Sequence, residues 1–482
     1  MNTVSKFDFH CTATMAKLSH NLRSARLKDL ALDLLGEQKI VRYEEAKTGS
    51  AEGFLNYAKK DADYTFRLFP VLKRELDDKN LWELYEFVEK PFLLINLECQ
   101  RNGIRYDVDA ARDEISSLDE KIALTKLKLN DPKMNWNSHK QLQRKLYGER
   151  GIPLAYHKGK VSTGKRALQS RAQDSLVRAV LELKECEALK RQILTIKKFV
   201  DPNTGRIHGY INPLGADTGR VTSSSPNLQN IKKDSVLRKM FVASKGYSLI
   251  ALDFSQIEPR VLAHFLGKQT PFARLFDVDE DFYGLLASEL KLEIHKQSDA
   301  RAVVKQIVLA TLYGMGPKTL SENLKVTQLN ASEILNLFFS KFPEIVEFKN
   351  QMIAEAREKE YVIGLLNRRR YIKSLNDVDN KLKFRAERQV LNSIVQGSAA
   401  TIFKFKGCEL RRQLPSTVRF LHHVHDEYIL EAPEQDASVM YRLAKQILER
   451  PLPWFSIPLK VDGGIGRSWL DAKNANKKKG GE

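Results

Sequence analysis

Apolar residues recur along the first part of the chain with the spacing of helices. Residues 51–76 show this spacing, and long charged helical patterns cover residues 109–129 and 174–199. Residues 88–115 predict a helix, a turn at Asn102–Gly103, a short strand and a further helix. Long helices therefore dominate the expected structure of this part.

Two later segments have the pattern of apolar strands with acids at their ends. Residues 247–253, YSLIALD, predict a strand that ends on Asp253. Residues 418–431, VRFLHHVHDEYILE, predict two strands that meet at a tight turn with Asp426 at its apex. An all-helical stretch, including an amphipathic helix over 299–314, separates the two segments. This order predicts an α+β fold whose antiparallel sheet is assembled from segments distant in the sequence.

The composition narrows the class of protein. The 482 residues suffice for roughly three domains at ~150 residues each, and 42% of them are apolar, so a sizeable core can form. Lys and Arg number 79 against 60 Asp and Glu, which gives a net charge of +19. This surplus favours a polyanionic partner, because basic side chains near phosphates release condensed counterions. A solvated basic surface is the alternative.

The cysteines and the apolar runs argue against other classes. The four cysteines are far apart without a CxxC pair, which disfavours a zinc site or a disulfide framework and fits a reducing cytoplasm. No apolar run approaches the ~20 residues that span a bilayer. The N-terminus lacks the pattern of a signal peptide. We therefore expect a cytoplasmic protein without a membrane partner.

The acids at the strand ends are candidate metal ligands. If the strands that carry Asp253 and Asp426 are neighbours, their carboxylates converge at one edge of the sheet, where oxygen ligands hold hard cations. Two such groups can hold a pair of Mg²⁺ ions ~3.5–4 Å apart for in-line phosphoryl transfer. Taken singly, each aspartate more often caps a turn or a helix.

The amphipathic helix over 299–314 strengthens the metal hypothesis. Arg301, Lys305, Leu309 and Tyr313 recur every four residues and therefore share one face. Two cations one turn apart can bind a triphosphate, and the apolar and aromatic residues beyond them can meet a sugar and a base. A solvated face would explain the cations but not the aromatic residue followed at once by Gly314.

These segments together resemble a known enzyme family. DFSQIEPRVLAH, RAVVKQIVLATLYG and VHDE resemble motifs A, B and C of the family A DNA polymerases, the bacterial DNA polymerase I type. TGRVTSSSPNLQNI and ERQVLNSIVQGSAA resemble two further segments of this family, and PFLLINLECQRNGI and NSHKQLQRKLYGERGI resemble its thumb region. The similarity runs from about residue 12 to Trp469. It implies a right-hand fold that adds dNTPs to a primer 3′ end on template DNA.

The resemblance also implies a division of the chain. Residues 1–85 would be a partial 3′–5′ exonuclease-like region and residues 86–205 the thumb and its base. Residues 206–280 would form the first part of the palm, 281–408 the fingers and 409–482 the second part of the palm.

The same resemblance implies roles for individual residues. Asp253, Asp426 and the carbonyl of Phe254 would bind two Mg²⁺ ions, with Mn²⁺ as an alternative and Glu427 as an auxiliary acid. Lys305 would also serve as an acid for the pyrophosphate. The remaining nucleotide contacts would come from Arg301, Leu309, Tyr313, Tyr283, Gln256 and from Glu258, a steric gate against the ribose 2′-hydroxyl. The primer and template contacts would come from Arg220, Asn227, Gln229, Arg388, Asn392, Gln396 and His425.

Two positions and the N-terminal region depart from the family pattern. Leu309 stands where relatives carry Phe or Tyr, so we expect discrimination against dideoxynucleotides. Tyr283 stands about where relatives carry a phosphate-contacting His. Tyr57 and Asp61 resemble the third motif of a proofreading site whose two other acidic motifs do not occur upstream. We therefore expect a vestigial exonuclease region without proofreading, unless a separate polypeptide supplies the missing half.

The absence of a 5′-nuclease region favours a phage-like or otherwise specialised enzyme of a bacterial or phage-infected host cell. Two alternatives share parts of the pattern. A single-subunit RNA polymerase would share the palm and both aspartates, but Glu258 next to SQI and HDE in place of HDS favour deoxynucleotides. An inert nucleic-acid-binding scaffold would explain the charge but not the combination of acids, cations and Tyr313.

Overall fold

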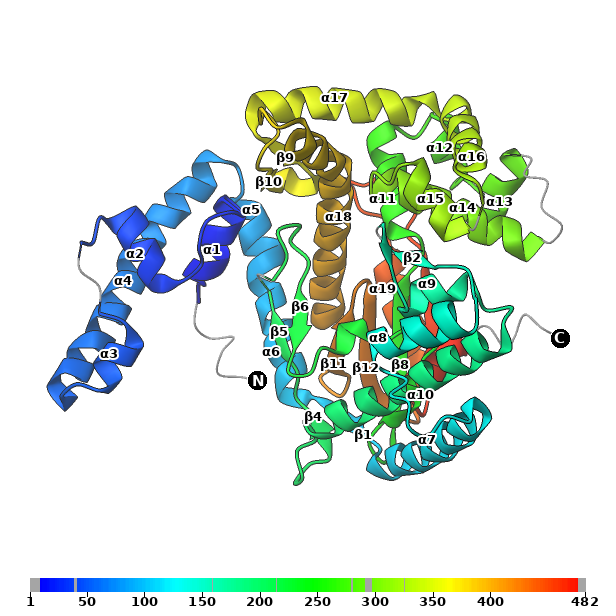
Figure 1. The fold of residues 1–482 in the computed structure, drawn as a ribbon. Helices are drawn as coiled ribbons and strands as arrows, with labels where there is room; N and C mark the ends of the chain where they lie inside the picture. The colour runs from blue at the N-terminus through cyan, green and yellow to red at the C-terminus, as the bar shows by residue number, and fades with distance from the viewer. Residues whose placement is uncertain are drawn as a thin grey trace.

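The computed structural model describes residues 9–38, 41–157, 159–213, 215–278, 281–290, 297–324 and 326–475 (Figure 1). Its centre is a four-stranded antiparallel sheet in the order β11-β12-β8-β13. The strands are β8 (Tyr247–Phe254), β11 (Arg419–Val424), β12 (Glu427–Pro433) and β13 (Val461–Gly466). The predicted strand pair and its tight turn are confirmed, and so is the antiparallel sheet built from distant segments.

The sheet is held by apolar side chains on both faces. Leu249, Ile250, Ala251 and Leu252 of β8 are all fully buried, which explains why this strand is a continuous apolar run rather than an alternating one. The helices packed against the sheet include α6 (Lys90–Asn102), α18 (Asn380–Gln413), α19 (Ala437–Glu449) and α20 (Trp469–Asn474).

A helical arm precedes the sheet and lies to one side of it in Figure 1. Its small apolar core includes Met15, Leu30, Leu68 and Leu72. The predicted helix over 51–76 is confirmed. The elements are α1 (Thr12–Ser19), α2 (Leu27–Leu35), α3 (Tyr43–Lys47) and α4 (Ala51–Asp78), followed by α5 (Trp82–Leu84) and the π-helix η2 (Tyr85–Glu89) that leads into α6.

Two long helices form a second projection. α7 (Val108–Leu129) packs along α10 (Ser175–Lys197), and both predicted helices are confirmed. Asp107 and Asp174 cap their first turns by accepting backbone N–H bonds. The segment between them holds α8 (His139–Gln143), η3 (Arg144–Glu149), β2 (Tyr156–His157), β3 (Lys160–Val161) and α9 (Lys165–Gln169).

Small strands and 3₁₀ turns connect this projection to the sheet. β1 pairs with two later strands at the predicted turn after α6. The elements are β1 (Ile104–Tyr106), β4 (Arg206–Ile207), β5 (Tyr210–Asn212), β6 (Thr222–Ser224), η4 (Leu228–Asn230), η5 (Val236–Met240) and β7 (Phe241–Val242).

A mainly helical region separates β8 from β11, at the top of Figure 1. The prediction of an all-helical stretch was wrong in one detail, because a two-stranded hairpin of β9 and β10 interrupts it. The helices are α11 (Ile257–Leu266), α12 (Pro271–Arg274), α13 (Phe282–Glu289), α14 (Gln297–Leu312), α15 (Pro317–Leu324), α16 (Gln328–Lys341) and α17 (Pro343–Lys359). The hairpin is β9 (Tyr361–Ile363), η6 (Leu365–Asn367) and β10 (Arg369–Tyr371). Within the described residues no helix is long and apolar enough to cross a membrane.

A buried ion cluster joins the start of α6 to α18. The Glu89 carboxylate accepts a hydrogen bond from Lys404 Nζ at 2.8 Å and pairs with Arg368, and all three side chains are buried. Burial alone raises the pKa of Glu89, but the attraction of Lys404 and Arg368 outweighs it and lowers this pKa to about 2. The carboxylate therefore stays charged and compensates two cations that the interior cannot solvate.

Replacement of Glu89 by Gln is expected to destabilise the fold by ~3–5 kcal/mol at neutral pH, because it leaves two buried cations without a counter-charge. The pKa of Glu89 is about 2 in the folded chain and ~4.3 in the unfolded chain. The carboxylate's contribution is therefore complete above pH ~4.3 and is lost as the pH falls toward 2. Urea unfolding at several pH values measures this difference between Glu89→Gln and the unmodified chain.

Glu86→Gln is the matched control. Its partner Lys90 lies at 2.6 Å, but the Glu86 side chain is 29% exposed, so the loss should stay within ~1 kcal/mol. Equal effects of the two substitutions would contradict the role assigned to burial.

Candidate active site

The central sheet brings together the two aspartates that the sequence singled out. In the register of the sheet, Asp253 of β8 lies opposite Glu427 of β12 and opposite Asp462 of β13. Asp426 immediately precedes β12, and its carbonyl accepts a hydrogen bond from the backbone N–H of Phe254 at 3.0 Å. The residues at 253 and 426 are therefore held at one end of the same strand pair, as predicted.

The hairpin turn between β11 and β12 presents Asp426 to a cavity. His425 has a left-handed backbone conformation with φ of 55°, which allows the turn to be tight. Burial raises the pKa of Asp426, and the nearby Asp253 carboxylate raises it further, while Arg220 opposes both effects. Two like charges in one partly buried place need cations to balance them.

In this structure basic side chains supply that balance. The Asp253 Oδ2 atom lies 3.1 Å from Lys233 Nζ and 2.5 Å from Lys473 Nζ. The Asp426 Oδ2 atom lies 3.5 Å from a guanidinium nitrogen of Arg220. Both carboxylates are therefore paired with ammonium or guanidinium groups.

Glu427 points into the interior beside these acids. Its side chain is 2% exposed and lies 3.1 Å from Arg238 Nη1. The indole N–H of Trp469 donates to the other carboxylate oxygen at 3.2 Å, and the guanidinium of Arg238 stacks 3.8 Å from the Trp469 ring. These contacts fix Glu427 and attach α20 to the sheet, so this acid has a structural task at the edge of the site.

A cavity of about 510 Å³ lies in front of the sheet end. Side chains or backbone of most predicted catalytic and nucleotide-binding residues line it. They are Arg220, Asp253, Phe254, Gln256, Glu258, Tyr283, Arg301, Lys305, Leu309, Tyr313, His425, Asp426 and Glu427. The helix α14 thus faces the carboxylates across the cavity, as its four-residue periodicity predicted.

On the α14 side the cations are exposed to the cavity. Arg301 makes two hydrogen bonds to Asp281, at 2.7 and 3.0 Å, and its guanidinium lies 5.5 Å from the Tyr283 ring centre. Lys305 and Leu309 follow on the same face and line the cavity. Asp281 therefore orients the guanidinium of Arg301 and keeps it at the cavity wall.

A polar chain crosses the cavity between the helices and the sheet. Arg220 donates to Glu258 at 2.8 Å, and the Tyr313 hydroxyl lies 3.3 Å from the other Glu258 oxygen. Burial raises the pKa of Glu258, and the attraction of Arg220 opposes this. Tyr313 also bonds to Gln396 of α18. Glu258 is therefore fixed between Arg220 and Tyr313 at the wall of the cavity.

The predicted primer and template residues are more dispersed. Arg220 and His425 line the cavity, and Gln396 reaches it through Tyr313. Arg388 packs beside Gly314, where an added Cβ would come within 2.8 Å of it. The Asn227 side chain caps η4 by accepting from the backbone of Gln229. The Asn392 and Gln229 side-chain amides have buried nitrogens without a hydrogen-bond partner in the described part of the chain, and Asn227 lines a separate hollow beside α10.

Sequence reasoning missed several residues of the site. Lys233 and Lys473 pair with Asp253, Asp462 lies opposite it in the sheet, and Asp281 holds Arg301. For Asp462 the signal was available, because it follows an apolar residue at a strand start. For the lysines there was none, since lysines are frequent throughout this basic chain.

The donor set at the sheet end suits hard cations. Asp253, Asp426 and the Phe254 carbonyl offer oxygen ligands of the kind that divalent ions of this class prefer. Among the described residues, no group of three or more His, Cys, Asp or Glu side chains is arranged for a metal ion. A bound ion would therefore draw part of its shell from backbone, substrate or water.

Tyr57 and Asp61 lie on α4, in the helical arm and not at this cavity. Asp61 is paired with Lys28, whose ammonium also stands 4.2 Å from the centre of the Tyr57 ring. A cation from the same chain thus accompanies the one acid of the predicted exonuclease motif.

Comparison with known proteins agrees with this geometry. A family model described as DNA polymerase family A matches residues 108–471. The thermostable DNA polymerase I of Thermus aquaticus is 35% identical over 428 residues, which cover 84% of this chain and 51% of the relative. DNA polymerase I of Chloroflexus aurantiacus is 31% identical over 499 residues, which cover 96% of this chain and 52% of the relative. The chain thus spans about half the length of these relatives.

A solved structure is similar over nearly the whole chain. It is the POL domain of Pol1 from M. smegmatis in complex with a DNA primer-template and dNTP, with a TM-score of 0.85 and 27% identity. The match covers 96% of this chain and 82% of that one. The right-hand fold expected from the sequence is therefore the fold of this chain. With the family model matching most of its length, the chain belongs to DNA polymerase family A.

Proposed function

We propose that this chain is a template-directed DNA polymerase that adds dNTPs to a primer 3′ end and releases pyrophosphate. One observation carries the proposal: Asp253 and Asp426 line one wall of a cavity, and Arg301 and Lys305 line the wall that faces them. Carboxylates at one wall and cations at the other suit a metal-bound triphosphate. The M. smegmatis domain, which is similar in fold, was solved with primer-template and dNTP and supports the same substrates.

Family A membership implies divalent metal ions, and the donor set fits them. We propose two Mg²⁺ ions, with Mn²⁺ as a substitute, held by Asp253, Asp426 and the Phe254 carbonyl. When bound, such ions lower the pKa of the primer 3′-hydroxyl and neutralise charge on the triphosphate. Lys233 and Lys473 now pair with Asp253, so they would move aside as the ions enter.

The remaining side chains would position and select the nucleotide. Arg301, oriented by Asp281, and Lys305 would bind the phosphates, and Lys305 would protonate the departing pyrophosphate. Tyr313 would close over the new base pair. Glu258 is held by Arg220 at 2.8 Å, so it would form a rigid wall against a 2′-hydroxyl.

This wall favours deoxynucleotides over a single-subunit RNA polymerase function. Primer extension with dNTPs and, in parallel, with rNTPs separates the two. Preferential extension with rNTPs would overturn the choice of substrate.

The domain roles follow from the same proposal. Residues 206–280 and 409–482 would be the palm, 281–408 the fingers and 86–205 the thumb with its base. For the N-terminal 85 residues, the pairing of Asp61 with Lys28 supports a region without its own metal site. A separate polypeptide that restored proofreading would have to displace Lys28.

Asp426→Asn is expected to abolish primer extension while duplex DNA binding persists. The substitution keeps the size of the side chain but removes a charge that would hold a metal ion. The loss of several kcal/mol of transition-state stabilisation should lower the rate of primer extension by a factor of ~10³ or more. Single-turnover extension measures the rate and fluorescence anisotropy the binding. Asp436→Asn is the control, because Asp436 lies beyond the other end of β12, at the start of α19. It should leave both unchanged, whereas an active Asp426→Asn enzyme would contradict the proposal.

Leu309→Tyr is expected to raise dideoxynucleotide incorporation relative to deoxynucleotide incorporation by about tenfold. A dideoxynucleotide lacks the 3′-hydroxyl and the hydrogen bond that this group makes. The phenol hydroxyl of a tyrosine near the sugar would supply a hydrogen bond in its place, worth ~1.5 kcal/mol. Competition between ddNTP and dNTP in primer extension measures the ratio. Leu309→Met lacks a hydroxyl and should keep the original discrimination. If the unmodified enzyme already used both nucleotides equally, the assignment of Leu309 would be wrong.

Lys473→Met is expected to tighten Mn²⁺ binding about fivefold in the DNA-free protein. The substitution removes a cation 2.5 Å from the Asp253 carboxylate, and such a pair is worth ~1 kcal/mol. Electron paramagnetic resonance of free Mn²⁺ measures the affinity directly. Lys445→Met removes a partly exposed cation of α19 that pairs with Glu449, and it controls for the change in net charge. An unchanged affinity in Lys473→Met would show that Lys473 does not compete with the metal.

A further inference from the structure

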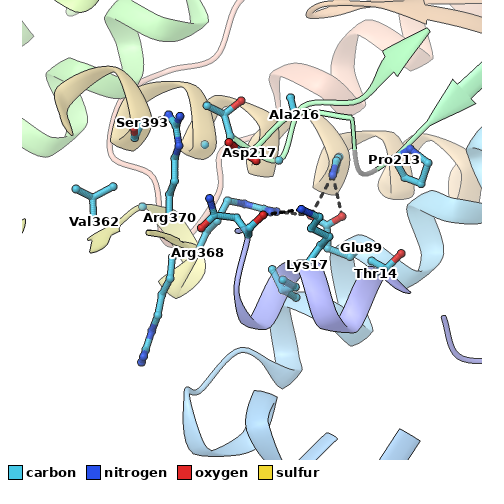
Figure 2. A pocket seen from close by; sticks show the side chains of 18 residues that line it. Thr14, Lys17, Glu89, Pro213, Ala216, Asp217, Val362, Arg368, Arg370 and Ser393 are labelled. Atoms are coloured by element: carbon cyan, nitrogen blue, oxygen red, sulfur yellow. Dashed lines mark hydrogen bonds and ion pairs between the residues drawn. The ribbon is translucent and has the colours of Figure 1, made fainter. Parts of the chain in front are cut away.

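A second cavity lies away from the carboxylates, between the helical arm and the main body of the chain. It has a volume of about 50 Å³. Its wall is formed by α1 and the residues just after it, the end of η2, the loop between β5 and β6, the β9–β10 hairpin and α18 (Figure 2). Five segments of the chain therefore enclose one small space.

Basic side chains dominate its wall. Five of them line it, namely Lys17, Arg368, Arg369, Arg370 and Lys404, against the two acids Glu89 and Asp217. Glu89 is already committed to Arg368 and Lys404, as described above. It therefore does not compensate the three remaining cations.

Those three cations are held by neutral atoms in the part of the chain that the structure describes. Lys17 Nζ donates to the carbonyl of Asn21 at 2.7 Å, and Arg369 Nη2 donates to the carbonyl of Lys79 at 2.9 Å. Arg370 Nη1 donates to the Ser393 hydroxyl at 2.6 Å, and Figure 2 shows this side chain reaching to α18.

Unsatisfied donors remain at the same place. The Nε atoms of Arg369 and Arg370 are buried without a hydrogen-bond partner in the described structure. Burial lowers the pKa of Arg370, and the attraction of Asp217 opposes this. Because an unpaired buried donor costs ~1–3 kcal/mol, these groups call for an acceptor that brings its own negative charge.

We infer that this cavity binds a single phosphoryl oxyanion, with inorganic phosphate as the free form. A water molecule requires ~10–15 Å³ of such space, so about 50 Å³ accommodates the four oxygens of one tetrahedral anion but no nucleoside. Guanidinium groups match the oxygens of phosphate with paired N–H donors. The bound anion would connect Lys17 of the arm to Arg370 of the hairpin.

The inference is independent of the proposed polymerase activity, and its test uses metal-free protein. Phosphate is titrated calorimetrically into the full chain in a chloride buffer with EDTA. All variants carry Lys305→Met, so that the cations of α14 contribute little to the heat. The expected result is saturable binding at one site, weakened tenfold or more by Lys17→Met or by Arg370→Met.

Lys59→Met is the charge-matched control, because it removes an exposed cation of α4 outside the cavity. Arg370→Lys, which keeps the charge but loses the planar donor pair, should bind with intermediate affinity. Circular dichroism and the melting temperature in chloride establish that each variant is folded. Phosphate should raise the melting temperature of the control and leave that of Arg370→Met unchanged.

Absence of saturable binding, or equal affinity in the Lys17→Met, Arg370→Met and Lys59→Met proteins, would overturn the inference. Repeating the titration with saturating primer-template duplex separates two sources of the phosphoryl group. Undiminished phosphate binding assigns the cavity to free phosphate, whereas competitive displacement assigns it to a phosphodiester of the DNA.

Discussion

The carboxylates of Asp253 and Asp426 repel each other at the end of one antiparallel strand pair, and the surrounding elements place cations against them. The backbone leaves little freedom, since β8 and β12 are paired along their whole length. The charge must instead be balanced by cations that surrounding elements deliver. Arg220, Lys233 and Lys473 do so from three different parts of the chain. Under the proposed function, divalent ions would take the place of these side-chain cations.

Glu427 shows how the same edge is kept rigid. Its carboxylate is buried between Arg238 and Trp469, and the stacked guanidinium and indole attach α20 to the sheet. The two acids on either side of the β12 start thus differ in environment. Asp426 faces a cavity and is available to ligands, whereas the carboxylate of Glu427 is occupied by its contacts with Arg238 and Trp469. The position of an acid within a sequence motif therefore does not decide whether its side chain faces the cavity or packs in the interior.

The same balance of charge recurs away from the cavity at the sheet end. Glu89 compensates Arg368 and Lys404 inside the protein, whereas Asp217 is the one other acid of the described cavity wall beside Lys17, Arg369 and Arg370. A protein with a net charge of +19 tolerates such places when an anion from outside completes them. Both cavities would in that case receive phosphoryl groups, one as substrate and the other as a structural ligand between the arm and the body.

The sequence by itself determined the long helices, the strand ends at Asp253 and Asp426, and the cationic face of α14. These features are local, because periodicity and the ends of apolar runs are written in consecutive residues. The β9–β10 hairpin escaped prediction because its strands have only three residues each, too few to show a period. Only the tertiary structure decided that Lys233 and Lys473 meet Asp253, and that Lys17 and Arg370 share a cavity. Each of these contacts joins separate segments of the chain. In a chain with so many lysines, nothing in the sequence around one of them indicates which residue it will contact.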